Sequence, residues 1–156
     1  LVLSEDDMRE DGRFKMNPPL RTPDDRDALV EGLADGSIDM VATDHAPHSR
    51  EEKSRGLKGS LMGVVGLECA FPVLYTKLVK TGKLTLERLT EAMSTAPARR
   101  FGVDTDGAYA VFDLGEAYTV DPEKFRSKGR ATPFDADTVY GKHIATLTHG
   151  QMLPES

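Results

Sequence analysis

The sequence predicts a parallel α/β architecture, a barrel or an open sheet, followed by a smaller β region. Over the first 102 residues, apolar runs of strand length alternate with helical patterns, which is the order of strand–helix units. After Gly102 the pattern changes to short β-prone runs separated by Gly, Pro and Asp turns. We therefore predict two domains, residues 1–102 and residues 103–156.

The length of the chain limits this architecture. The chain has 156 residues, whereas a (β/α)8 barrel usually needs roughly 250. Two strand–helix units are too few to close a barrel, so we expect the last strands and helices of one. The chain opens on the apolar Leu1-Val2-Leu3 without an initiating Met, which favours a fragment or a processed chain.

The first strand–helix unit is expected near the N-terminus. Residues 14–20, FKMNPPL, predict a short strand that stops at its two prolines, because proline cannot donate to a central ladder. Thr22 then predicts a helix start, with proline at the first helical position and acids in the first turn, and Gly36 predicts its end. The apolar stripe of this helix is expected to comprise Ala28, Leu29, Leu33 and Ala34.

The second unit starts with residues 38–43, IDMVAT, a run that a strand buried on both faces would have. Residues 49–59 are rich in Arg, Lys, Glu and Gly and predict a mobile loop. Helices are expected at residues 66–79, kinked or shifted by Pro72, and at residues 85–93. The β region is expected to contain YAVFDL, AYTV, DTVYG and HIATLTHGQML as strands.

Composition excludes several classes of protein. Lys and Arg total 20 against 26 for Asp and Glu, and no basic stripe of the kind that nucleic acid requires is present. The apolar runs are far shorter than the roughly 20 residues that span a bilayer, and no signal peptide is recognisable. The single cysteine, Cys69, has apolar neighbours and is expected to be a buried inert thiol in a cytoplasmic protein.

The run ATDHAPH, residues 42–48, concentrates the residues that carry chemistry. In parallel α/β folds, polar groups just after a strand face the reaction site, which would place Asp44 and His48 there. The Asp44 carboxylate suits a metal ligand and a proton acceptor, and it equally suits the cap of a turn. His48 is consistent with substrate binding, metal binding or pairing with an acid. His45 is expected to be structural, because it points the other way.

Two motifs make the chain resemble dihydroorotases. Residues 42–48 followed by Lys53 resemble the second signature of that family, and residues 15–21, KMNPPLR, resemble its preceding strand end. The segments 63–68 and 96–102 extend the resemblance over nearly the whole chain. Hydantoinases and allantoinases share the strand-end Asp but usually differ at the positions of Asn17 and His48.

The resemblance implies a barrel with a site for two zinc ions and a bridging hydroxide, and a small β-sandwich portion. It implies that Asp44 is a zinc ligand and the catalytic acid or base. It also implies that Asn17 and His48 bind dihydroorotate or carbamoyl aspartate, and that Met62 and Gly63 contact the same substrate through backbone groups. Without the resemblance, Asn17 is as well explained as a turn residue before the two prolines.

Three functions follow as alternatives. The leading one is an enzyme that hydrolyses a cyclic amide in pyrimidine synthesis, with its remaining metal ligands upstream of Leu1. The second is a non-catalytic scaffold for aspartate transcarbamoylase, and the third is another cyclic amidase. The chain alone is expected to be inactive and to self-associate, and the loop at residues 49–59 either closes over the pocket or forms a solvated surface.

Overall fold

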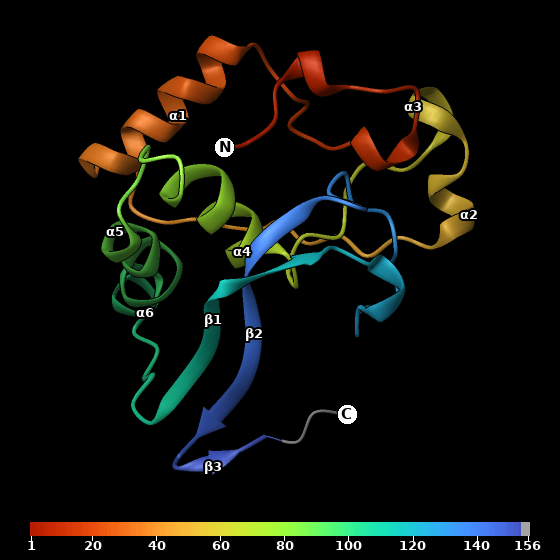
Figure 1. Cartoon of the computed structure of the whole chain (residues 1–156). Coiled ribbons are helices and arrows are strands. Elements are labelled where there is room, and N and C mark those ends of the chain that lie inside the picture. Colours follow the sequence, from red (N-terminus) through yellow and green to blue (C-terminus); the bar gives the residue numbers. More distant parts are fainter. Residues whose placement is uncertain (154–156) are drawn as a thin grey trace.

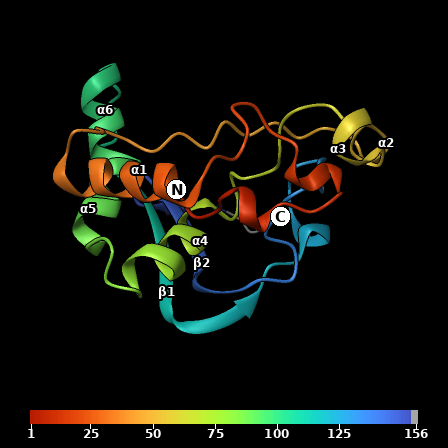
Figure 2. The same cartoon turned by 90° about the horizontal axis from the view of Figure 1, so that it is seen from above.

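The computed structural model describes residues 1–153. Helices α1, α5 and α6 lie on one side of the molecule, α2 and α3 lie on the opposite side, and α4 lies between them (Figures 1 and 2). The strands β1, β2 and β3 extend away from the helices as a long hairpin with a short third strand (Figure 1). None of the helices within residues 1–153 is both long enough and apolar enough to cross a membrane.

The α-helices are α1 (Pro23–Asp35), α2 (Arg50–Lys53), α3 (Gly56–Gly59), α4 (Ala70–Leu74), α5 (Leu86–Thr90) and α6 (Ala96–Phe101). Short 3-10 helices cover Glu5–Asp7, Gly12–Phe14 and Pro122–Lys124, and π-helical turns cover Tyr75–Val79 and Glu91–Thr95. The strands are β1 (Ala108–Thr119), β2 (Thr138–Thr148) and β3 (Gln151–Met152).

Helix α1 begins and ends where the sequence predicts. Thr22 and Asp25 form a reciprocal capping box, Pro23 is the first helical residue, and Gly36 ends the helix in the left-handed region at φ 87°. The predicted apolar stripe is wrong in part. Leu33 is buried, but its buried partner is Val30, three residues earlier on the same face, while Ala28, Leu29 and Ala34 are exposed.

The two later helical predictions are confirmed with shifted bounds. The first helix starts at Ala70, four residues after the predicted Gly66, and continues from α4 into the π-helical turn. Pro72 lies in its first turn, where a missing N–H costs no helical hydrogen bond, so the proline shifts the start instead of kinking the helix. The second runs from Leu86 through a π-helical turn to Phe101.

The two strands predicted at residues 14–20 and 38–43 are wrong as regular strands. Residues 12–14 form a 3-10 turn, and residues 38–43 belong to no ladder. Within the described residues, parallel pairing is limited to a single bridge between His45 and Val64. A parallel strand is stabilised by neighbours on both edges, and these segments have too few for regular pairing. The polar loop at residues 49–59 contains α2 and α3 instead of being irregular.

The β region is confirmed, with the predicted short runs merged into longer strands. Strands β1 and β2 pair antiparallel from Ala108 opposite Thr148 to Thr119 opposite Thr138, interrupted by two irregularities in register. Among the described residues a single sheet forms, in the order β1-β2-β3. The Phe71 ring of α4 stacks on the Phe112 ring of β1 with centroids 4.1 Å apart, which joins the sheet to the helices.

Two apolar clusters hold these elements together. The larger lies among α1, α4 and α5 and comprises Val30, Leu33, Leu74, Leu78, Leu84, Leu89 and Ala92. The smaller joins the helical part to the sheet and comprises Cys69, Val73, Val120 and Val139. Because this second cluster takes residues from both sides of Gly102, the two predicted domains share apolar contacts, and the division at residues 1–102 and 103–156 stays a prediction. Cys69 is 1% exposed, and burial raises the pKa of its thiol.

Candidate active site

Three segments that are far apart in the sequence meet at one place. The Gly63 N–H donates to the Lys15 carbonyl at 3.0 Å, which joins the segment before Asn17 to the segment of Met62. The Ala46 N–H donates to the Val64 carbonyl at 3.0 Å, next to the parallel bridge at His45. The structure therefore brings together the segments that carry Asn17, Asp44 with His48, and Met62 with Gly63.

Lys53 ties these segments together from the buried side. Its ammonium group donates to the carbonyls of Lys15, Leu61 and Gly63 at 3.0, 2.8 and 2.6 Å. The residue is 5% exposed, which is rare for a lysine. Burial, followed by the positive charge of Lys15, lowers the pKa of its ammonium group.

Asp44 stands at the entrance to the loop in an uncommon backbone conformation. Its φ is 45°, in the left-handed region, which costs a non-glycine residue on the order of 1 kcal/mol and which Asp tolerates better than most. Its side chain is exposed, and no other residue within 1–153 makes a hydrogen bond or ion pair with its carboxylate. No hydrogen bond therefore supports the alternative that Asp44 caps a turn, and the carboxylate faces solvent.

His48 has one ring nitrogen in use. A backbone carbonyl only accepts, so the Nε2–H donates to the Met62 carbonyl at 2.8 Å. The other nitrogen, Nδ1, lies 3.9 Å from an exposed carboxylate oxygen of Glu52. The ring therefore orients the Met62 peptide, and its role in substrate binding stays a prediction.

Gly63 is required by close approach as well as by its backbone angle. Its φ is 120°, and a Cβ atom at this position would lie 2.5 Å from the Ala46 Cβ and 3.2 Å from the His48 Nε2. Any larger residue would separate two of the three segments.

Two donors remain open to a ligand among these groups. The carbonyls of Met62 and Gly63 and the Gly63 N–H are all engaged, whereas no acceptor within residues 1–153 faces the Met62 N–H. The side chain of Asn17 is exposed, as is that of Met62, which is 56% exposed. The Met62 N–H and the Asn17 amide are therefore the donors of these segments that remain free to bind an acceptor.

His45 is anchored away from this place, as predicted. Its Nδ1 accepts the N–H groups of Gly66 and Leu67 at 3.3 and 3.2 Å, so the ring proton lies on Nε2. That proton faces the Ser127 Oγ at 3.2 Å, and the Ser127 hydroxyl donates to Glu68 at 2.6 Å. With its proton on Nε2, His45 cannot deprotonate Ser127, so the trio is a structural relay and not a nucleophile with its base.

The chain is similar to known proteins over nearly its whole length. The chain is 48% identical to the dihydroorotase of Listeria innocua over 98% of its length, and 46% identical to that of Bacillus caldolyticus over 99%. Over nearly its whole length the chain is therefore similar to part of a dihydroorotase. It spans 38% of the length of these two relatives. No protein-family model matches the chain.

Solved structures show the same fold relationship. The L-hydantoinase (dihydropyrimidinase) of Arthrobacter aurescens matches 98% of this chain with a TM-score of 0.86 and 33% identity, and the chain covers 37% of it. The dihydropyrimidinase of Brevibacillus agri matches 90% of this chain with a TM-score of 0.81 and 25% identity, and the chain covers 33% of it. The chain thus has the fold of part of an amidohydrolase (β/α)8 barrel with a small β portion.

No group of three or more His, Cys, Asp or Glu side chains within residues 1–153 is placed to hold a metal ion. Tetrahedral zinc needs three or four such donors. The described residues therefore do not fit a zinc site by themselves.

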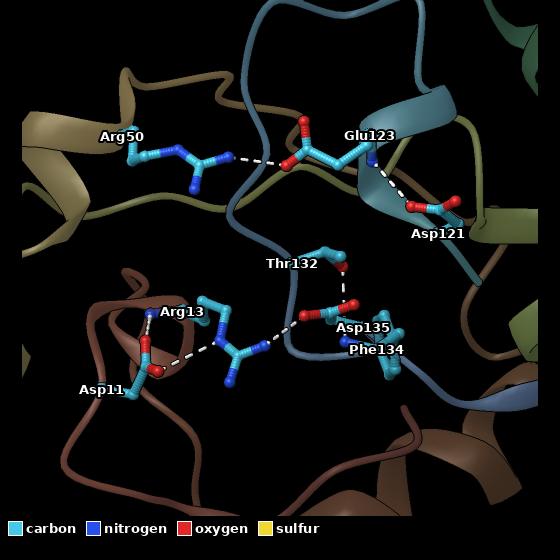
Figure 3. Close-up of polar contacts among 8 residues, drawn as sticks. All are labelled: Asp11, Arg13, Arg50, Asp121, Glu123, Thr132, Phe134 and Asp135. Carbon is cyan, nitrogen blue, oxygen red and sulfur yellow. Dashed lines mark hydrogen bonds and ion pairs between the residues drawn. The ribbon is translucent and has the colours of Figure 1, made fainter. Parts of the chain in front are cut away.

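A pocket of about 270 Å³ lies between α2 and the loop at residues 121–135, and Lys53 is one of its lining residues. It is lined by arginines whose charges are balanced within the chain (Figure 3). Arg13 pairs with Asp11 at 3.1 Å and with Asp135 at 2.7 Å. Arg50 pairs with Glu123 at 2.6 Å, and Arg130 lies 3.6 Å from the same carboxylate. These pairs tie α2 to the β region and leave no arginine of this pocket free for an anion.

The sequence did not reveal two parts of this arrangement. Lys53 was recognised in the signature, but nothing local separates it from the other lysines and arginines of residues 49–59. Ser127 is 82 residues from His45 and lies outside every motif, so it gave no signal. His143 and His149, the other two histidines, are exposed in the β region, away from these motifs.

Proposed function

We propose that the complete protein carrying this chain is a dihydroorotase, which reversibly hydrolyses dihydroorotate to carbamoyl aspartate in pyrimidine synthesis. The observation that supports this most is the convergence of the segments of Asn17, Asp44 and Met62 at one place. Those are the segments that carry the family resemblance, and Asn17 and Met62 lie 45 residues apart in the printed sequence. We propose a cytoplasmic protein, because its one cysteine is a buried free thiol.

In this proposal Asp44 moves the proton. A water oxygen adds to the carbonyl carbon of the ring amide, and the Asp44 carboxylate accepts the proton that this water loses. When the carbon–nitrogen bond breaks, Asp44 returns the proton to the leaving nitrogen, which balances the reaction. An exposed carboxylate without an internal partner is free to do both.

Substrate recognition falls to the neutral donors. The Asn17 amide and the Met62 N–H donate to the carboxylate of dihydroorotate, and the fixed Gly63 peptide holds Met62 in place. His48 contacts the same substrate in this proposal, while its Nε2–H stays on the Met62 carbonyl and orients that peptide.

We propose Asp44 as one ligand of a site for two zinc ions, whose other ligands belong to the rest of the complete protein. Zinc would supply Lewis-acid activation of the water and of the amide carbonyl. The described residues do not form this site alone, and none of the proton transfers above depends on it. Self-association or binding to aspartate transcarbamoylase is a further proposal for the complete protein.

A second candidate is a cyclic amidase that acts on hydantoins. It is favoured by the structural similarity to the Arthrobacter aurescens enzyme, at a TM-score of 0.86. The test is the turnover of dihydroorotate, hydantoin and allantoin by the purified complete protein. Preference for dihydroorotate supports the proposal, and preference for hydantoin or allantoin supports the second candidate instead. Binding to aspartate transcarbamoylase without turnover of any of the three supports the scaffold alternative.

A further inference from the structure

Lys53 is the feature of this region that the proposed roles leave unused. Its side chain contacts two of the three converging segments, through the carbonyls of Lys15, Leu61 and Gly63. An ammonium group has three N–H donors, and these three carbonyls satisfy all of them. A buried charge is costly unless its hydrogen bonds are made. The buried position of the Lys53 ammonium group therefore requires these three hydrogen bonds.

These contacts fix the direction of the Met62 N–H. Leu61 C=O and Met62 N–H belong to the same peptide, and that peptide is trans, as are all peptides within residues 1–153 other than Asn17–Pro18. In a planar trans peptide the N–H points opposite to the C=O. Since the carbonyl points at Lys53, the N–H points away from it, toward the side that Lys53 does not occupy.

The next peptide is fixed at both ends by other partners. His48 donates to the Met62 carbonyl at 2.8 Å, and the Gly63 N–H donates to the Lys15 carbonyl at 3.0 Å. Lys53 then binds the Gly63 carbonyl, which follows directly. Four hydrogen bonds therefore set three consecutive peptides, and two of the four come from Lys53.

We infer that Lys53 is a positioning residue that presents the Met62 N–H as the donor for a carboxylate group of the substrate. It acts through the backbone of residues 61–63 and does not touch the ligand. The identity of that ligand rests on the proposed function, whereas the effect of Lys53 on the backbone does not.

The test compares two lysines of the same loop in the complete protein. Lys53→Met keeps the length of the side chain and removes the three donors, and Lys53→Gln restores up to two of them. Lys58→Met is the matched control, because Lys58 is exposed and its side chain makes none of these contacts. The readouts are site-resolved amide hydrogen exchange, which needs no substrate, and KM and kcat for dihydroorotate.

Exchange at the Gly63 amide is expected to be at least about tenfold faster in Lys53→Met, with Lys53→Gln between it and wild type and helix α1 unchanged. KM should rise about tenfold while kcat changes less than about threefold, because binding is lost and the proton-transfer group is not. Lys58→Met should match wild type in both.

Unchanged exchange at Gly63 in Lys53→Met would overturn the inference. Equal acceleration in α1 and at Gly63 for both Lys53 variants would also overturn it, since that is the result of a general structural role. If the wild-type protein does not turn over dihydroorotate, the proposed function fails, while the exchange result still decides whether Lys53 holds residues 61–63.

Discussion

The converging segments and the three-stranded sheet are stabilised in different ways. In the sheet, β1 and β2 pair along nine residue positions of each strand, so each backbone contact is one of many. Around Asp44, a single parallel bridge and a few hydrogen bonds from Lys53, His48 and Gly63 hold three segments together. A regular ladder tolerates the loss of one contact, whereas the candidate site depends on individual residues. Substitutions in the two regions should therefore differ in kind.

The largest expected effect is at Asp44. Asp44→Asn in the complete protein should reduce kcat for dihydroorotate by at least about 100-fold, because the amide cannot accept the proton. Asp39→Asn is the matched control, since Asp39 is an exposed aspartate of the preceding segment. Its kcat should equal that of wild type. Retention of kcat within about tenfold in Asp44→Asn would contradict the role of Asp44.

The sheet should respond to substitution in stability and not in catalysis. Val139 is fully buried in β2, and Val139→Ala should lower the free energy of unfolding by about 2 kcal/mol through lost burial and a residual cavity. Val111→Ala in β1, where the side chain is 42% exposed, should cost less than about 1 kcal/mol. Urea denaturation measures both. A change in KM for Val139→Ala would contradict the expectation that the sheet affects stability and not catalysis.

His48→Ala should chiefly weaken substrate binding. KM for dihydroorotate is expected to rise about tenfold, since the variant loses a substrate contact and the hydrogen bond that orients the Met62 peptide. Bound zinc in the complete protein should stay at the wild-type level. His143→Ala removes an exposed histidine from β2 and should leave KM unchanged. Loss of zinc from His48→Ala would show instead that His48 is a metal ligand.

A smaller effect is expected at Glu68, which supports the loop of Asp44 through Ser127. Burial alone would raise the pKa of Glu68, but hydrogen bonds from Ser127 and Arg126 outweigh it and hold the pKa below its ordinary value of 4.5. A carboxylate whose pKa is lowered by folding stabilises the protein at pH values above its unfolded-state pKa. This stabilisation is lost as the pH falls through its folded-state pKa.

Glu68→Gln should thus be less stable than wild type. The difference in free energy of unfolding should be greatest near neutral pH and shrink as the pH falls below about 4.5. Thermal unfolding as a function of pH measures this difference. The control is Glu87→Gln, which changes an exposed glutamate in α5. A difference between wild type and Glu68→Gln that grows toward low pH would contradict the assignment.

The same contrast explains what the sequence predicted. Local chemistry sets the caps of α1 at Thr22 and Gly36, and alternation with turns sets the β region, so both were predictable. The strands at residues 14–20 and 38–43 were wrong, because a parallel strand depends on neighbours that are distant in the sequence. The partners of Lys53 and the contact of Ser127 with His45 are also distant, and the residue types alone do not reveal them.

The most direct test of the account is a crystal structure of the complete protein with dihydroorotate. We expect the substrate carboxylate within about 3 Å of the Met62 backbone nitrogen and the Asn17 amide nitrogen, with the ring amide facing the Asp44 carboxylate. Lys53 should still bind the carbonyls of Lys15, Leu61 and Gly63. Dihydroorotate bound away from the three segments, with the Met62 N–H facing solvent, would contradict it.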